Sequence, residues 1–208
     1  MTLIMNNAER DGMPGGETKR IVFFTLPPVR EIDLVGAVDV FTSANRAVGG
    51  KPLYGIKVVN AEKARADRKI VGMCGLSLYC DLDFRSFRGE IDTLLIPGGT
   101  GVEESCPDAA AVQWLRQAAT DSRRVGSICT GAFLLAHAGL LDGRRVTTHW
   151  AFAAELAKRY PKVNVDSEPI WIQDDNQWSA IHCVNCAFGW RSILGPIFPC
   201  LHWRNAWQ

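Results

Sequence analysis

Residues 124–139, RVGSICTGAFLLAHAG, place a cysteine between a predicted strand and a predicted helix. Residues 124–128 form a short run typical of a buried strand, and residues 130–138 have the composition of a helix that ends at Gly139. Ser127 and Gly131 stand two positions before and after Cys129, which is the small-x-nucleophile-x-small spacing of a nucleophile elbow. We therefore expect Cys129 on a tight strand-to-helix turn, where larger flanking side chains would collide.

The position of Cys129 also predicts its chemistry. The thiol would lie at the N-terminus of the following helix, where the helix dipole and free N–H groups stabilise a thiolate and lower the thiol pKa. On this interpretation Cys129 is reactive without a histidine partner. The alternative is that Cys129 only packs, because free cysteine is also a common small buried residue.

The rest of the chain alternates between strand-like and helix-like segments. Strands are predicted at 21–26, 55–60, 91–96, 124–128, 144–149 and 169–173, and a bent strand or ribbon at 70–80. Helices are predicted at 32–47, from Pro107 to 119, at 130–138 and at 151–159. This alternation predicts a flavodoxin-like α/β fold, in which a mostly parallel sheet has helices on both faces and ligands bind at the carboxyl ends of the strands.

A second glycine-rich turn follows the strand predicted at 91–96. Pro97, Gly98 and Gly99 close that strand at the edge of the sheet where Cys129 is expected. Glycines allow backbone N–H groups to approach a ligand closely and to form an oxyanion hole. The same three residues are equally compatible with a plain turn.

Composition restricts the class of protein. The 208 residues are 47% hydrophobic and 22% charged, and 23 Lys and Arg balance 22 Asp and Glu, so no global field favours nucleic acid or a membrane surface. We find no run of 18 apolar residues and no secretory signal, and the seven cysteines are an odd number. We therefore expect a cytoplasmic protein with free thiols and no membrane segment.

The two ends of the chain differ from the middle. Residues 1–20 are polar and are interpreted as a flexible leader, and residues 21–178 as one domain. Residues 179–208 contain no Asp or Glu, and we interpret them as an atypical tail produced by a frame change or truncation, without a helix-turn-helix. The tail could offer zinc ligands from His182, Cys183, Cys186, Cys200 and His202, but the surrounding sequence does not resemble a zinc knuckle. We expect no metal site and no cofactor.

Five sequence blocks, in the same order as in a known family, carry a resemblance. They are residues 32–36 (IDLVG, followed by DVF at 39–41), 95–99 (LIPGG), 127–136 (SICTGAFLLA), 139–144 (GLLDGR) and 147–150 (TTHW). On these blocks the chain resembles the DJ-1/PfpI superfamily of class I glutamine amidotransferase-like domains. The similar branch is the one found in AraC-type transcriptional regulators and in isonitrile hydratase.

The resemblance implies roles for several residues. Asp33 stands where the superfamily keeps an acidic residue against the nucleophile, either as a carboxyl protonated by burial beside a thiolate or as a general acid or base. Thr130 replaces the histidine of the protease-like members, so the resemblance implies no Cys-His peptidase. It also implies that Cys129, Thr130 and Asp33 are the set with which isonitrile hydratase-like members add water to an isonitrile carbon. We expect Gly98, Gly99, Gly131 and His149 to contact a ligand, although a lone histidine is more often structural.

Two main functions remain open at this stage. The first is a sensing domain for a small nitrogen-containing molecule, resembling the N-terminal part of AraC-type regulators, with no direct DNA binding by this chain alone. The second is a cysteine-dependent hydratase. A redox-sensing oligomeric module is a third possibility that depends on an easily oxidised thiol. We expect a homo-oligomer in each case.

Overall fold

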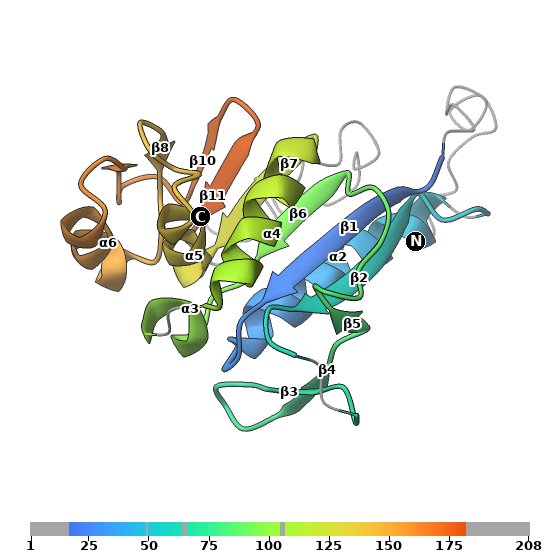
Figure 1. Ribbon diagram of the computed structural model, residues 1–208. Helices are drawn as coiled ribbons and strands as arrows, with labels where there is room; N and C mark the ends of the chain where they lie inside the picture. Colours follow the sequence, from blue (N-terminus) through green and yellow to red (C-terminus); the bar gives the residue numbers. More distant parts are fainter. Residues whose placement is uncertain (1–16, 49, 64–65, 105–106, 182–208) are drawn as a thin grey trace, which may run out of the picture.

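The computed structural model describes residues 17–48, 50–63, 66–104 and 107–181, which form one α/β unit around a seven-stranded sheet (Figure 1). The strand order is β10-β11-β7-β6-β1-β2-β5, and every neighbouring pair is parallel except β10 with β11. The strands are β1 (Lys19–Thr25), β2 (Tyr54–Asn60), β5 (Leu82–Asp83), β6 (Thr93–Ile96), β7 (Arg124–Ile128), β10 (Trp171–Asp174) and β11 (Gln177–Ala180). The predicted mostly parallel sheet is therefore confirmed.

Helices cover both faces of this sheet (Figure 1). One face packs on α2 (Glu31–Val48), and the other packs on α4 (Ala109–Asp121) and α5 (Ala132–His137). The helices α3 (Thr100–Glu104) and α6 (Ala153–Arg159) contribute to the same apolar core as α4 and α5. Successive side chains of β1 point to opposite faces, so Phe23 meets Phe41 of α2 and Phe24 stacks on Trp114 of α4, with ring centroids 6.3 and 4.9 Å apart. Because both faces are covered, residues 21–26 are buried throughout, and all of them except Thr25 are apolar.

Two small sheets lie outside the main one. The antiparallel ribbon of β3 (Lys69–Val71) and β4 (Ser77–Tyr79) occupies the segment predicted as a bent strand or ribbon. It is joined to the chain just before α2, because the Val29 N–H donates to the Val71 carbonyl (3.0 Å) and the Met73 N–H donates to the Val29 carbonyl (2.9 Å). The second small sheet pairs β8 (Arg145–Val146) with β9 (Asn164–Val165).

Two predicted segments differ in the structure. The strand predicted at 144–149 is reduced to β8. The Thr147 N–H donates to Ser179 Oγ and the Thr148 hydroxyl donates to the Cys129 carbonyl, so these two residues do not continue the strand pairing. The helix predicted from Pro107 begins at Ala109, because the Asp108 carboxylate caps it by accepting from the Ala110 N–H.

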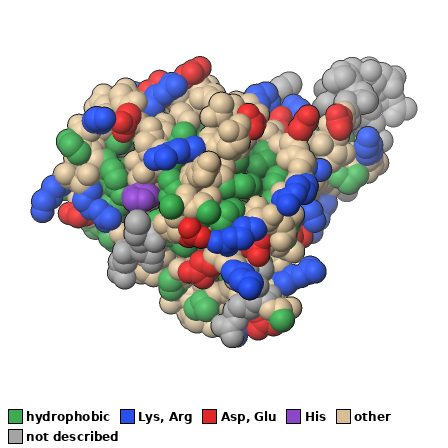
Figure 2. All heavy atoms as spheres, in the orientation of Figure 1, with side chains coloured by type: hydrophobic (Ala, Val, Ile, Leu, Met, Phe, Trp, Pro, Cys, Tyr) green, Lys and Arg blue, Asp and Glu red, His purple; other side chains and the backbone are tan. Residues whose placement is uncertain are grey.

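The ends of the sheet bear on the predicted domain limits. Strand β11 pairs with β7 through Ala180, so the sheet includes Ser179 and Ala180, the first two residues of the predicted tail. Residues 1–16 of the predicted leader and residues 182–208 of the tail lie outside the described residues. None of the described helices is long and apolar enough to cross a lipid bilayer. Figure 2 shows basic and acidic side chains interspersed on the face that it presents.

Candidate functional site

The site is built around the turn between β7 and α5. Cys129 follows directly on β7 and has a φ of +55°, a left-handed conformation that costs a non-glycine residue about 1 kcal/mol or more. It opens a short 3-10 helix (Cys129–Gly131) that leads into α5, and its side chain is completely buried. The thiol thus lies at the carboxyl edge of the sheet, where parallel α/β folds place their ligands.

Three other predicted site residues surround Cys129. Asp33, from the first turn of α2, and Thr130 are both fully buried. Gly98 follows β6 and lies between them: a Cβ atom at this position would be 2.8 Å from Asp33 Oδ2, 2.8 Å from Thr130 Oγ1 and 3.0 Å from Cys129 Cβ. Only glycine allows these three chain segments to approach so closely. The fold therefore brings Asp33, Gly98, Cys129 and Thr130 together.

The other two predicted glycines serve contacts within the protein. The Gly99 N–H donates to Thr130 Oγ1 at 3.0 Å, and the Gly99 backbone packs on the carbonyl of Pro28. Gly131 packs on the carbonyl of Ile96 at the end of β6. The Gly99 amide thus already has an acceptor, and the ligand-binding role expected for these two glycines stays a prediction.

The ionisation of Cys129 differs from expectation. Burial, followed by the negative charge of Asp33, raises the pKa of Cys129 to about 12. A hydrogen bond from the Thr130 backbone and the positive charge of Arg30 act in the opposite direction but are outweighed. The predicted lowering of the thiol pKa is therefore wrong: desolvation and the adjacent carboxylate are stronger than the stabilisation offered by the helix N-terminus.

His149 has a structural role in this arrangement. Its Nδ1 accepts from the Ala151 N–H at 3.2 Å and caps the 3-10 helix η2 (Trp150–Phe152). Its ring stacks on Trp150, with centroids 5.4 Å apart, and meets Phe152 edge to face at 5.7 Å. A ligand contact by His149 stays a prediction.

Thr148 is a residue of the site to which sequence reasoning gave no role. Its hydroxyl donates to the Cys129 carbonyl at 2.7 Å, in a buried hydrogen bond between segments that are 19 residues apart. The TTHW block contained this threonine, but no local pattern shows which carbonyl its hydroxyl reaches. Thr148 supports the backbone of the elbow directly.

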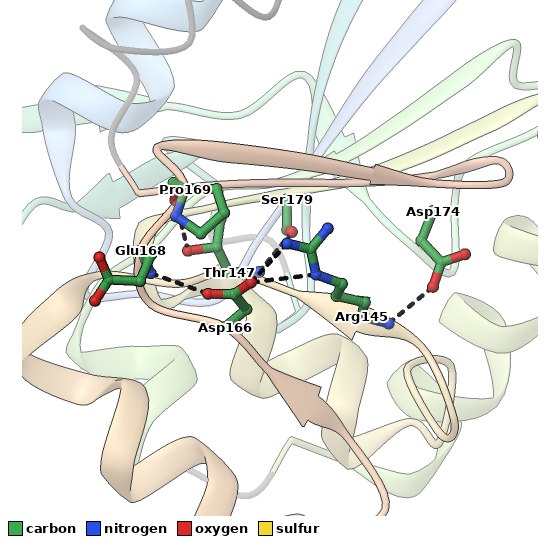
Figure 3. Close-up of polar contacts among 7 residues, drawn as sticks. All are labelled: Arg145, Thr147, Asp166, Glu168, Pro169, Asp174 and Ser179. Carbon is green, nitrogen blue, oxygen red and sulfur yellow. Dashed lines mark hydrogen bonds and ion pairs between the residues drawn. The ribbon is translucent and has the colours of Figure 1, made fainter.

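A set of polar contacts fixes the segment that carries Thr148 (Figure 3). The Thr147 N–H donates to Ser179 Oγ at 2.8 Å, and Thr147 Oγ1 donates to the Pro169 carbonyl at 3.1 Å. The Arg145 N–H donates to Asp174 Oδ2 at 2.8 Å. These contacts attach the segment after β8 to β10 and β11, beside the strand β7 that ends at Cys129.

Within the described part of the chain, no group of three or more His, Cys, Asp or Glu residues is arranged to hold a metal ion. The possible zinc ligands at 182, 183, 186, 200 and 202 lie outside the described residues. Of the other described cysteines, Cys74 is exposed and Cys80 is buried, and both are free thiols.

Comparison with known proteins identifies the family. Residues 19–181 match the DJ-1/PfpI family, and the chain belongs to it. The crystal structure of an AraC family transcriptional regulator from Pseudomonas putida has the same fold, with a TM-score of 0.68 and 20% identity over 86% of this chain and 94% of that one.

Three relatives show the range of proteins in which such a domain occurs. The chain is 35% identical to an uncharacterised Streptomyces lividans protein over 68% of this chain and 95% of the relative. It is 32% identical to isonitrile hydratase of Pseudomonas putida, over 64% of this chain and 53% of the hydratase. It is 30% identical to the HTH-type transcriptional regulator GbdR of Pseudomonas aeruginosa, over 69% of this chain and 37% of the regulator. The chain thus spans about half of the hydratase and about a third of the regulator.

Proposed function

We propose that this DJ-1/PfpI domain senses a small molecule in the regulation of transcription, and that Cys129, Asp33 and Thr130 form its ligand site. The relationship to an HTH-type regulator supports this function. We prefer a sensor to an enzyme because the Cys129 thiol is completely buried beside the Asp33 carboxylate, and its pKa is raised.

A neutral thiol is suited to binding and not to nucleophilic attack. The thiolate is the nucleophilic form of cysteine, and a thiol whose pKa is raised in this way stays protonated at neutral pH. The Gly99 amide, which could otherwise stabilise developing negative charge, is already bonded to Thr130. Both features favour a site that holds its ligand unchanged.

The groups at the site indicate the class of ligand. The Asp33 carboxyl, which lies 4.0 Å from Arg30 Nε, has oxygens that accept hydrogen bonds, and the Cys129 thiol and Thr130 hydroxyl are further polar groups of the site. A small molecule with a cationic or N–H-bearing nitrogen matches a buried carboxyl of this kind. We therefore propose a small nitrogen-containing metabolite.

The second candidate is an isonitrile hydratase-like enzyme. It is favoured by the 32% identity to that enzyme and by the proximity of Cys129, Thr130 and Asp33. In this reaction Asp33 would take the thiol proton as sulfur adds to the isonitrile carbon, and would return that proton to the same carbon. Water would then displace sulfur and give the formamide.

A binding and turnover experiment distinguishes the two functions. The purified chain is titrated calorimetrically with small amines, quaternary ammonium compounds and alkyl isonitriles, and formamide production from the isonitriles is followed by chromatography. We expect at least one amine or ammonium compound to bind and no isonitrile to be turned over. The binding is expected to be lost in Cys129→Ala and kept in Cys80→Ala, which removes a buried thiol elsewhere. Steady formamide production that requires Cys129 would overturn the sensor and establish the enzyme.

A further inference from the structure

Glu31, the first residue of α2, connects the candidate site to the β3–β4 ribbon. Its side chain is buried, with 7% of the residue exposed, although it carries a carboxylate. Oε1 accepts from the Cys74 N–H at 2.8 Å, in the turn between β3 and β4. A buried carboxylate that is hydrogen-bonded in this way is strongly fixed in position.

The turn of the ribbon is shaped to receive this carboxylate. A Cβ atom at Gly72 would come within 2.6 Å of Glu31 Cγ and closer still to the carboxyl group, so only glycine leaves space for the side chain. The Gly72 N–H donates to the Leu76 carbonyl at 3.1 Å and closes the turn. Burial alone would raise the pKa of Glu31, but hydrogen bonds from the backbone of Glu31, Cys74 and Leu76 lower it, so the side chain is charged at neutral pH.

The same helical turn that Glu31 anchors also carries Asp33. The Arg30 N–H donates to the Gly98 carbonyl at 2.8 Å, and the Asp33 N–H donates to the Arg30 carbonyl at 3.1 Å. The first turn of α2 is therefore held at two points, by Gly98 of the site and by the ribbon through Glu31. Glu31 and Asp33 are two residues apart in a turn of about 3.6 residues, so the backbone of that turn links the contact with the ribbon to the contact with the site.

We propose that Glu31 is a positioning residue that holds Asp33 against Cys129 by anchoring α2 to the ribbon, and that it thereby keeps the thiol unreactive. Of the charged groups that act on Cys129, Asp33 raises the thiol pKa more than Arg30 lowers it, and Asp33 lies in the turn that Glu31 begins. The proposal depends on the Cys129–Asp33 pair and not on the identity of any ligand. The proposal gives the β3–β4 ribbon a role in the candidate site through the hydrogen bond between Cys74 and Glu31.

The test measures the rate at which iodoacetamide alkylates Cys129 at pH 9, with each cysteine followed separately by mass spectrometry. Glu31→Ala is expected to raise this rate about tenfold, because a fall of one unit in the thiol pKa gives ten times more thiolate. Glu31→Gln keeps an oxygen that can accept from the Cys74 N–H, and should raise the rate less than threefold. Asp39→Ala removes an exposed acidic group from the same helix and should leave the rate unchanged.

A double-mutant cycle separates positioning from a general loosening of the fold. Asp33→Asn alone should raise the Cys129 rate, and adding Glu31→Ala to it should raise the rate no further. Gly72→Ala disturbs the contact between Glu31 and the ribbon from the other side, so it should raise the Cys129 alkylation rate as Glu31→Ala does. The proposal can then be tested with either variant if the other folds poorly. The proposal is overturned if Glu31→Ala leaves the rate unchanged, or if its effect persists in full in the Asp33→Asn protein. Because no ligand is used, the result is independent of the sensing function.

Discussion

At the scale of single residues, the candidate site depends on glycine as much as on the groups that carry chemistry. Asp33, Gly98 and Cys129 are far apart in the chain, and they meet because Gly98 has no side chain. The sequence indicated Gly98 and Cys129 by their turns after predicted strands, and Asp33 by the resemblance to the family. It could not show that Gly98 is the point of contact, because a plain turn has the same residues.

Replacing Gly98 by alanine tests this close approach. The added Cβ would overlap Asp33 Oδ2 and Thr130 Oγ1, so Gly98→Ala should lower the free energy of unfolding by about 1–3 kcal/mol. The control is Gly55→Ala in β2, where a Cβ atom meets only Thr18 Cγ2 at an ordinary 3.6 Å. Urea unfolding measures both variants, and equal stability of the two would contradict the packing described for the site.

At the scale of elements, the strands and helices that position the site are those that apolar patterns predict, and the exceptions have polar causes. The segment after β8 leaves the predicted strand because Thr147 bonds to Ser179 and Pro169, and Thr148 bonds to Cys129. A run of β-branched residues favours a strand in sequence analysis. Hydrogen bonds to residues distant in the chain decide its actual path.

Thr148 offers a test at this scale. Thr148→Val keeps the side-chain shape but leaves the Cys129 carbonyl without its donor, so we expect the free energy of unfolding to fall by about 1–2 kcal/mol. Thr148→Ser retains the hydroxyl and should recover most of the loss. Chemical denaturation compares the three proteins. If Thr148→Ser destabilises the chain and Thr148→Val does not, the methyl group of Thr148 matters and its hydroxyl does not, which would contradict the assigned role.

At the scale of the whole molecule, the candidate site lies at the carboxyl ends of the strands and a charged network lies at their amino ends. Arg124, buried at the start of β7, faces Asp92 at 3.7 Å, and Asp92 also accepts two hydrogen bonds of 2.8 Å from Arg123. Burial would raise the pKa of Asp92, but hydrogen bonds from Arg123 and Thr93 and both arginine charges hold the pKa below its ordinary value. This network joins β6 and β7 at the end opposite Cys129.

The network predicts how stability depends on pH. Because the pKa of Asp92 is lower in the folded chain than in the unfolded one, its contribution is present above the unfolded value and is lost as pH falls through the folded value. Asp92→Asn should therefore reduce the free energy of unfolding by about 2 kcal/mol at pH 7 and by much less at pH 3.

The control is Asp142→Asn. Asp142 forms an exposed ion pair with Lys162, so this variant should change the free energy of unfolding by less than about 0.5 kcal/mol at either pH. Thermal unfolding across this range checks both; a loss at Asp92 that does not depend on pH would contradict the assignment.

The sequence by itself determined the α/β class, the mostly parallel sheet, the DJ-1/PfpI relationship and the meeting of Cys129, Asp33 and Thr130. The class and the sheet follow from local apolar periodicity, and the rule that parallel strands end at one edge places Cys129 beside the turn that follows residue 96. The family relationship and the roles of Asp33 and Thr130 follow from the resemblance of the five sequence blocks to that family. Only the tertiary structure decided that the Cys129 pKa is raised, that the Gly99 amide bonds to Thr130, that Thr148 bonds to the Cys129 carbonyl, and that Glu31 accepts from the Cys74 N–H. The physical reason is that burial and long-range hydrogen bonds arise from packing between segments distant in the chain, and no local pattern encodes them.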